Sequence, residues 1–492
     1  MLVICLAGAL ALASLPRLRP AAAAAVAIAL SAVVLALAVG AAVSFDRSRA
    51  GSVQFAVDHS WIPQLGIRFH IGVDGLSLPL VVLTALLTLL CCIYSSRSLP
   101  EPGNAATFFA LLLILEAALI ATFVALDLLL FFAAFESVLL PMYFLIAVWG
   151  GAARKAAATK FVLFTLLGST LMLVAMLALR ARTGTSDLLA MVAAHGSTIP
   201  SGAQDAIFLG LLAAFAIKAP LWPLHSWLPD AHSQAPTAGS VLLAGVLLKM
   251  GTYGLLRIAV PILPHAAHTF APLLGVLAGI AIVYGGLCCL GQRDAKRLVA
   301  YSSVGHMGFV LLGIATLTPL GVSAALYGNI AHGVITSLLF FLVGGIRERT
   351  RSYEIAGIGS GLLERAPRLG SILIFALVAT LGLPGLAGFW GEVLAIFASY
   401  HPAAGISTAL FRVLMGVALV GTLVAAGYAL WLIQRVATGR GAPGAAKLKD
   451  VTVVEWLSWG PLIALTLLLG VYPRIVLGVS RAAALVVLGG GS

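Results

Sequence analysis

Seven ionisable residues stand inside long apolar stretches of this sequence, where a charge is costly. They are three acids, two lysines and two histidines: Glu116, Glu136, Glu392, Lys218, Lys249, His306 and His332. An ionisable side chain at membrane depth costs several kcal/mol on most scales, so each of these is a candidate functional residue. Carboxylates, amines and imidazoles all take up and release protons, and the chemistry that they share is proton transfer.

A row of such groups at similar depth is what a proton relay requires. Desolvation lowers the pKa of a buried lysine and a nearby carboxylate raises it again, so the separation of the two groups sets the protonation of the amine. Histidine titrates near neutral pH and can bridge gaps between other groups. The alternative is a set of buried ion pairs that fix helix register. One pair is enough for that, and seven residues on seven predicted helices favour the relay. Taken singly, each histidine is equally well explained as a hydrogen-bonding residue between helices.

The composition is that of a polytopic membrane protein. Of the residues 61% are hydrophobic and only 9% are charged, and the mean hydropathy is +1.10, whereas a soluble domain is about 25% charged. The formal net charge is +12. The Lys and Arg residues stand in short gaps between apolar runs, so they are interpreted as topology-setting charges and not as a nucleic-acid site.

About fourteen membrane-spanning helices are predicted, since about 20 apolar residues cross a bilayer as a helix. Their approximate limits are 1–15, 21–43, 76–95, 107–124, 126–148, 161–179, 205–228, 236–256, 270–290, 299–316, 321–345, 370–399, 413–434 and 456–473. The first resembles the core of a signal peptide, but no positively charged segment precedes it, which favours a retained, short first helix.

The basic residues predict the orientation of these helices. Of the 29 Lys and Arg residues, 18 fall in the loops after odd-numbered helices and nine on the other side, with Lys218 and Lys249 inside helices. The positive-inside rule then places the first set in the cytoplasm and both termini outside. The longest loop, about residues 44–75, is expected on the outer surface.

Metal and nucleotide signatures are missing from the sequence. The five cysteines lie in apolar runs without a CxxC spacing, so neither a zinc site nor an iron–sulfur cluster is supported and buried free thiols are expected. No flavin, haem or nucleotide motif is recognised, and no cofactor is expected on this chain.

Two predicted helices are interrupted beside an ionisable residue. Pro220 and Pro223 follow Lys218, and Pro384 with four glycines precedes Glu392. Proline removes a helix hydrogen bond, and broken helices near the midplane mark ion sites in transporters. Because the two broken helices lie five helices apart, the pattern predicts two inverted repeats, helices 4–8 (about 107–256) and 9–13 (about 270–434), within a single transmembrane domain of residues 1–492.

Four segments carry a resemblance to a known family: "FESVLLPMYFLI", "RDAKRLVAYSSVGHMGF", "GFWGE" and the long "KAPLWPLHSWLPDAHSQAPTAGSVLLAGVLLKMGTYGLLR". The chain resembles the antiporter-like subunits of respiratory complex I from about Gly72 to about Tyr472. Within that superfamily it is most similar to the subunit M (mitochondrial chain 4) branch. It has Glu392 where the L and N branches and the multisubunit sodium/proton antiporters generally carry lysine, and it lacks a long C-terminal lateral helix.

The resemblance implies a fold of fourteen helices with two inverted five-helix repeats, in a proton-translocating subunit of NADH-quinone oxidoreductase. Glu136 would pair with Lys218, Lys249 would be the central relay residue, and the two histidines would connect it to Glu392, with Glu116 as an auxiliary carboxylate. FMN, iron–sulfur clusters and quinone would belong to other subunits of the complex. The expected partners are L-type and N-type membrane-arm subunits, in a bacterial inner membrane with both termini on the periplasmic side.

Three alternatives stay open at this point. One is a subunit of a sodium/proton antiporter without a redox arm, which lysine in place of Glu392 would have favoured. Another is the membrane arm of a hydrogenase or a ferredoxin-oxidising enzyme, which neighbouring genes would identify. The third is a structural subunit that moves no ions, and the complete row of charges argues against it.

Overall fold

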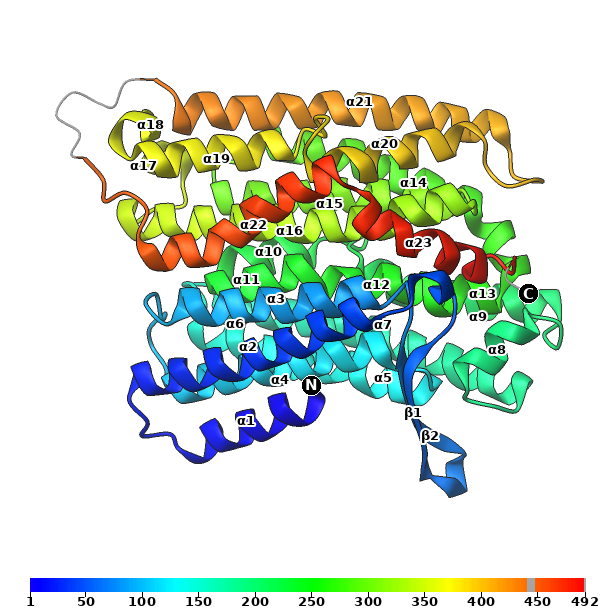
Figure 1. Cartoon of the computed structure of the whole chain (residues 1–492). Coiled ribbons are helices and arrows are strands. Elements are labelled where there is room, and N and C mark those ends of the chain that lie inside the picture. The colour runs from blue at the N-terminus through cyan, green and yellow to red at the C-terminus, as the bar shows by residue number, and fades with distance from the viewer. Residues whose placement is uncertain (440–446, 491–492) are drawn as a thin grey trace.

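The computed structural model describes residues 1–439 and 447–490, and nearly all of its helices run side by side in one bundle (Figure 1). Among the described residues, twelve helices are long and apolar enough to cross a membrane. The predicted count of fourteen is not confirmed. The remaining two segments are a 13-residue helix at the N-terminus and a helix broken into pieces of 13 and 14 residues.

The elements follow one another along the chain in this order. The first part contains α1 (Leu2–Ser14), α2 (Pro20–Ser44), η1 (Arg47–Arg49), β1 (Gln54–Ile62), η2 (Pro63–Leu65), β2 (Ile67–Val73), α3 (Leu78–Ser95), α4 (Ala105–Val124), α5 (Leu128–Ser137), α6 (Leu139–Trp149), α7 (Arg154–Thr183) and α8 (Leu188–Ala194). The middle contains α9 (Ser201–Lys218), α10 (Trp227–Gln234), α11 (Thr237–Leu242), η3 (Leu243–Leu247), α12 (Leu248–Gly254), η4 (Leu255–Ala259), α13 (Val260–Ile262), α14 (Pro264–Leu290) and α15 (Ala295–Ala315). The last part contains α16 (Pro319–Thr350), α17 (Ile355–Ile358), α18 (Leu362–Arg365), α19 (Pro367–Ala379), α20 (Ala387–Tyr400), α21 (Thr408–Leu432), η5 (Ile433–Ala437), α22 (Val453–Val471) and α23 (Arg474–Val487).

The two broken helices are present, although the first breaks earlier than the predicted span 205–228 implies. Helix α9 stops at Lys218, and Pro220 and Pro223 lie in the connection to α10. Helix α19 stops at Ala379, and Pro384 lies in the connection to α20. Proline cannot donate the backbone hydrogen bond that would continue either helix, so each break begins close to its prolines.

The order of elements repeats across the two predicted repeats. The first runs α4, α5 with α6, α7, the broken pair α9 and α10, and then the continuous helix Thr237–Ile262. The second runs α14, α15, α16, the broken pair α19 and α20, and α21 with η5. In each set the third helix is the longest, at 30 and 32 residues, and the fourth is broken. This agreement supports the repeat, whose inverted relation stays a prediction.

One end of the bundle carries the hairpin formed by β1 and β2 and is called the hairpin end below; the other is the opposite end (Figure 1). The longest predicted loop, about residues 44–75, contains a hairpin that was not predicted, because residues 54–73 pair as antiparallel strands. Most β1 side chains are exposed on both faces, so the strand lacks the alternation of apolar and polar residues that reveals a half-buried strand.

Helix α23 was also missed, because it is too short to span a membrane. It buries Val476, Val479, Ala483 and Val487 at helical spacing and lies at the hairpin end, where it packs against α16.

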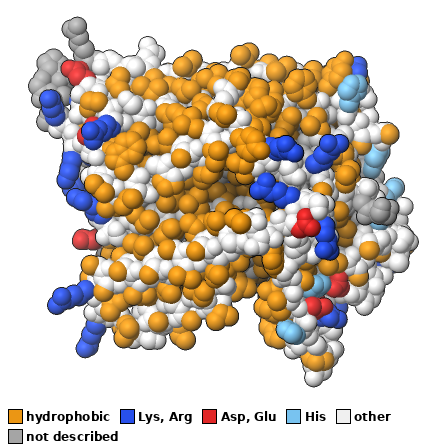
Figure 2. Space-filling view, viewed as in Figure 1, with side chains coloured by type: hydrophobic (Ala, Val, Ile, Leu, Met, Phe, Trp, Pro, Cys, Tyr) orange, Lys and Arg blue, Asp and Glu red, His pale blue; other side chains and the backbone are white. Residues whose placement is uncertain are grey.

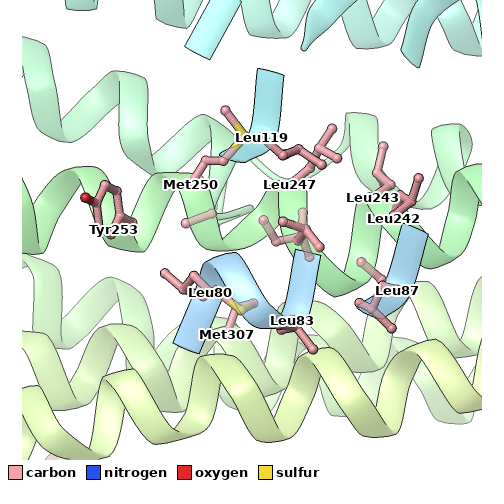
Figure 3. Packing of buried hydrophobic residues seen from close by; sticks show 14 of the residues in the cluster. Leu80, Leu83, Leu87, Leu119, Leu242, Leu243, Leu247, Met250, Tyr253 and Met307 are labelled. Carbon is pink, nitrogen blue, oxygen red and sulfur yellow. The ribbon is translucent and has the colours of Figure 1, made fainter. Parts of the chain in front are cut away.

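The helix Thr237–Ile262 lies at the centre of the bundle, and every residue of its most apolar segment is buried. Leucines of α3 pack against it, with Leu80, Leu83 and Leu87 near Leu243 and Leu247 (Figure 3). The outward faces of α7 and α21 are apolar, as Leu167 and Leu423 illustrate with exposures of 60% and 72%. Figure 2 shows the matching distribution, in which hydrophobic side chains cover the middle of the molecule and charged ones gather toward its two ends. This surface fits lipid or neighbouring membrane subunits.

Two expectations about individual residues need correction. The orientation count places Arg257 in a loop, but it is buried within the helix Thr237–Ile262. Four of the five cysteines are buried as expected, whereas Cys288 is only half-buried. Arg440, another residue counted for orientation, lies outside the described residues.

Candidate functional site

Lys249 is fully buried at the middle of the central helix and contacts a histidine directly. Its Nζ lies 2.5 Å from Nδ1 of His332 on α16 and donates a hydrogen bond to the Ala244 carbonyl at 2.5 Å. Ala244 belongs to a π-helical turn, η3, and such turns occur frequently at functional sites because they leave backbone groups free for other partners. The turn thus supplies an acceptor for the ammonium group inside the membrane.

A second pair links α15 to the broken helix α20. Nδ1 of His306 lies 2.8 Å from Oε1 of Glu392, and the two side chains are only 12% and 11% exposed. The hydroxyl of Tyr428 lies 3.2 Å from the other ring nitrogen of His306. The second carboxylate oxygen of Glu392 is buried without a partner. An acid and a base in direct contact can exchange a proton without a large movement.

The two pairs are close to each other. The rings of His306 and His332 have centroids 6.0 Å apart, and Nε2 of His332 is buried without a partner. A cavity of about 30 Å³ is lined by both histidines, Glu392 and Thr380, which is roughly the volume that one water molecule occupies. The remaining gap between the two histidines is therefore within reach of a single bridging water.

The break between α19 and α20 shapes the surroundings of Glu392. Gly382 adopts a left-handed backbone conformation with φ of +68°, which glycine adopts without strain. A Cβ at this position would lie 3.0 Å from Oε2 of Glu392. The backbone of the break thus approaches the carboxylate more closely than another residue type would allow.

Glu136 and Lys218 form the corresponding group in the first repeat. Glu136, on α5, accepts a hydrogen bond from the Ser169 hydroxyl of α7. The expected pairing with Lys218 is not a direct contact, because no ion pair joins the two residues in the part of the chain that the structure describes. Lys218 is the last residue of α9 and is 3% exposed. Its ammonium group lies 4.9 Å from the centre of the Phe135 ring and 5.9 Å from that of Phe161, as in a cation–π site.

A glycine contact connects this group to Lys249. Gly251, two residues after Lys249, packs its backbone against the end of α9: a Cβ there would lie 2.5 Å from the Phe215 carbonyl oxygen and 2.7 Å from the Ala219 nitrogen. Ala219 directly follows Lys218. The absence of a side chain at Gly251 therefore lets the two lysine-bearing helices touch.

Glu116 is placed apart from these groups. It lies on α4, fully buried, where Oε2 accepts a hydrogen bond from the Cys5 thiol of α1 at 3.6 Å and Oε1 has no partner. The other six predicted residues form two clusters, one around Glu136 and Lys218 and one from Lys249 to Glu392. The structure brings Glu116 into contact with neither.

His232 was not predicted, although it is as buried as Lys249. Its ring stacks on Phe340 with centroids 4.5 Å apart, and neither ring nitrogen has a partner. Nearby, the buried Lys296 donates to the Ala235 carbonyl at 2.5 Å. Ala235 also lines a cavity of about 740 Å³ at the opposite end. The sequence signal was a histidine in the same proline-rich stretch that follows Lys218.

The chemistry of these groups is that of proton transfer. From Lys249 to Glu392 they offer an amine, two imidazoles and a carboxylate at direct or one-water separations, in a buried site. Among residues 1–439 and 447–490, no group of three or more His, Cys, Asp or Glu residues is placed to hold a metal ion. Buried acids and bases in a row across a helix bundle, beside two broken helices, define the class of antiporter-like membrane proteins.

Comparison with known proteins specifies the class further. Residues 125–421 match the family model described as NADH:quinone oxidoreductase/Mrp antiporter, transmembrane, and residues 52–122 match that of NADH-ubiquinone oxidoreductase chain 4, amino terminus. The chain is 43% identical to NADH-quinone oxidoreductase subunit M of Rhodobacter capsulatus over 443 residues, which cover 88% of this chain and 84% of that protein. It is 39% identical to NADH-ubiquinone oxidoreductase chain 4 of Marchantia polymorpha, over 86% and 83% of the two chains.

Solved structures agree with these matches. A chain of respiratory complex I from Thermus thermophilus superposes with a TM-score of 0.87 at 31% identity, covering 99% of this chain and all of that one. A chain of the Mrp complex from Dietzia, at 24% identity and a TM-score of 0.85, shares the fold; the match covers 98% of this chain and 52% of that one. The chain therefore belongs to the family of NADH-quinone oxidoreductase subunit M, the antiporter-like chain 4 of respiratory complex I.

Proposed function

We propose that this chain relays protons across the membrane as a subunit of NADH-quinone oxidoreductase, through Glu136, Lys218, Lys249, the two histidines and Glu392. The observation that carries the proposal is the direct contact of Lys249 with His332, next to the direct contact of His306 with Glu392. FMN, iron–sulfur clusters and quinone would be held by other subunits, which would drive the relay by NADH oxidation and quinone reduction.

The surroundings of Lys249 support a direction for the relay. The cavity at the opposite end and the unpartnered ring of His232 lie on the side from which α11 enters the bundle. A proton taken up there would pass His232 to reach Lys249, and would then move through the histidines to Glu392. We place the opposite end at the cytoplasm and the hairpin end in the periplasm, as the distribution of Lys and Arg predicts. Neighbouring L-type and N-type subunits would cover the apolar sides of the bundle.

The test removes the central amine. In the intact complex, reconstituted in liposomes, Lys249→Ala is expected to abolish this chain's share of the protons moved per NADH oxidised, because the amine that contacts His332 is then gone. Lys160→Ala is the matched control, since Lys160 is partly exposed and pairs with Asp230 at the surface. An assembled Lys249→Ala complex that pumps with the wild-type ratio would exclude Lys249 from the relay.

The sodium/proton antiporter alternative is distinguished by Glu392. The acid pairs with His306, in the position where the antiporter subunits are expected to carry lysine. Replacing sodium by potassium in the same liposome assay is therefore expected to leave the pH gradient unchanged, and a requirement for sodium would favour the alternative.

A further inference from the structure

Arg257 places a second charge on the central helix, between Lys249 and the hairpin end. The two residues are eight positions apart, and eight residues of helix rise about 12 Å. The Arg257 side chain is 9% exposed, so its charge is held within the bundle and not at its surface.

A closed set of hydrogen bonds fixes this arginine. Its Nη2 lies 2.6 Å from Oδ1 of Asp74, and its Nε donates to the Tyr253 hydroxyl at 3.0 Å. The Tyr253 hydroxyl in turn donates to the Phe123 carbonyl at 2.7 Å. Oδ1 of Asp74 also accepts from two backbone N–H groups just before α3. The Tyr253 hydroxyl proton is committed to a carbonyl, and its oxygen already accepts from the guanidinium.

The layer around Tyr253 is aromatic and buried. Tyr253 is 1% exposed, stacks on Phe131 with ring centroids 6.4 Å apart, and meets the edge of Phe123 at 5.2 Å. In Figure 3 its ring lies past Met250 on the helix, on the far side from Leu247. A cavity of about 20 Å³ reaches Arg257 and Asp74 among residues of the hairpin end, such as Val486. Space from the hairpin end thus extends as far as the arginine.

We propose that Arg257, held by Asp74 and Tyr253, is a barrier that prevents a proton on Lys249 from leaving directly toward the hairpin end. A guanidinium group stays charged in proteins and therefore cannot pass a proton on. The Asp74 carboxylate, 2.6 Å away, offsets much of the charge at longer range, so the barrier depends on the inability of the guanidinium to release its proton. The path sideways through His332 to Glu392 has no such cation, so the barrier directs protons along the relay.

The aromatic layer extends the barrier, because the Phe123 and Phe131 rings beside Tyr253 carry no group that could pass a proton past the arginine. The inference rests on the proposed role of Lys249 as the residue that holds the proton.

The experiment measures the passive proton leak of the intact complex in liposomes, as the decay of an imposed pH gradient without NADH. The double variant Arg257→Met with Asp74→Asn removes both charges and avoids leaving an unpaired carboxylate. It is expected to leak several-fold faster than the wild type while NADH:quinone electron transfer continues. Adding Lys249→Ala is expected to abolish the extra leak, because the proton source is then gone.

Three further variants separate a barrier from a purely structural tie between helices. Asp74→Asn alone keeps the arginine and is expected to hold the gradient as the wild type does, whereas Arg257→Lys supplies an amine that can release its proton and is expected to leak. Arg68→Met with Asp58→Asn removes an exposed ion pair of the hairpin and is the matched control. If the double variant does not assemble, Tyr253→Phe replaces it, with a smaller but Lys249-dependent leak expected.

The barrier is excluded if the double variant holds the gradient, or if its leak persists in the Lys249→Ala background. Failure of the relay itself would be seen separately, as wild-type pumping by Lys249→Ala alone.

Discussion

The contact of Gly251 with the end of α9 gives the most direct test of how the relay is assembled. A methyl group at this position would lie 2.5 Å from the Phe215 carbonyl oxygen, where ordinary van der Waals contact begins at 3.4 Å. Gly251→Ala must therefore separate the two backbones by up to 3.4 − 2.5 = 0.9 Å. Neither partner can rotate away, because the nearest atoms belong to the backbone of α9 and to the Cβ of Ala219.

Two consequences of this displacement can be estimated. Overpacking a close helix contact costs about 1–3 kcal/mol. Displacing reacting groups by about 1 Å costs up to about 100-fold in rate, and the helices displaced here carry Lys218 and Lys249. Gly251→Ala is therefore expected to reduce proton pumping far more than it reduces the thermal stability of the complex.

The assay compares protons moved per NADH oxidised with the inactivation temperature of the same reconstituted complex. Gly416→Ala is the control, since Gly416 lies in α21 and a Cβ added there would have no other atom within 4 Å, and alanine there gains about 0.5–1 kcal/mol of helix propensity. Wild-type pumping and stability in Gly251→Ala would refute the reasoning, because the two helices would then not depend on this contact.

Three other predictions concern single charges. Glu136→Gln should impair pumping more than Glu116→Gln, since Glu136 neighbours Lys218 while Glu116 contacts only the Cys5 thiol; equally small effects would favour the ion-pair interpretation. Arg349→Met should lower the inactivation temperature strongly. Arg349 makes two 2.7 Å contacts with Glu455, both side chains are less than a tenth exposed, and breaking a buried pair costs about 3–5 kcal/mol. The control, Arg68→Met at an exposed pair, should leave that temperature nearly unchanged. The Arg68 guanidinium holds the pKa of Asp58 below its usual 3.8. The ion pair therefore stabilises the hairpin above pH 3.8, and this contribution is lost as the pH falls below that value. Proteolysis of the hairpin should increase below about pH 4 in the wild type, and Asp58→Asn should show no such change.

The features that could be predicted from sequence share one cause. A helix that crosses a membrane needs a long apolar run, so helices such as α14 and α16 were located from composition alone. The breaks after Lys218 and before Glu392 were located because proline and glycine act on the backbone regardless of tertiary context. The row of ionisable residues stood out because the background around it is apolar.

The features that were missed depend on contacts that no short segment encodes. Arg257 resembled a loop residue because it lies near the end of its apolar run, and only the fold shows that Asp74, 183 residues earlier, meets it inside the bundle. His232 stands in a polar, proline-rich segment where burial is not expected. Glu116 matched the pattern of the relay residues in every local respect, yet the packing of α1 against α4 separates it from them.

The two halves of the proposed relay have different surroundings, and these suit a lysine on one broken helix and an acid on the other. Lys218 is the last residue of α9, where the free carbonyl groups of a helix C-terminus favour a cation. Glu392 lies five residues beyond the start of α20, and the helix dipole falls off within the first turn, so the N-terminus of α20 contributes little to it. Its partner is instead His306, in direct contact. A lysine at position 392 would place two basic groups next to each other. The cluster from Lys249 to position 392 would then contain no carboxylate. The glutamate thus makes this half of the relay alternate between base and acid, and a proton that reaches His306 has an acceptor next to it.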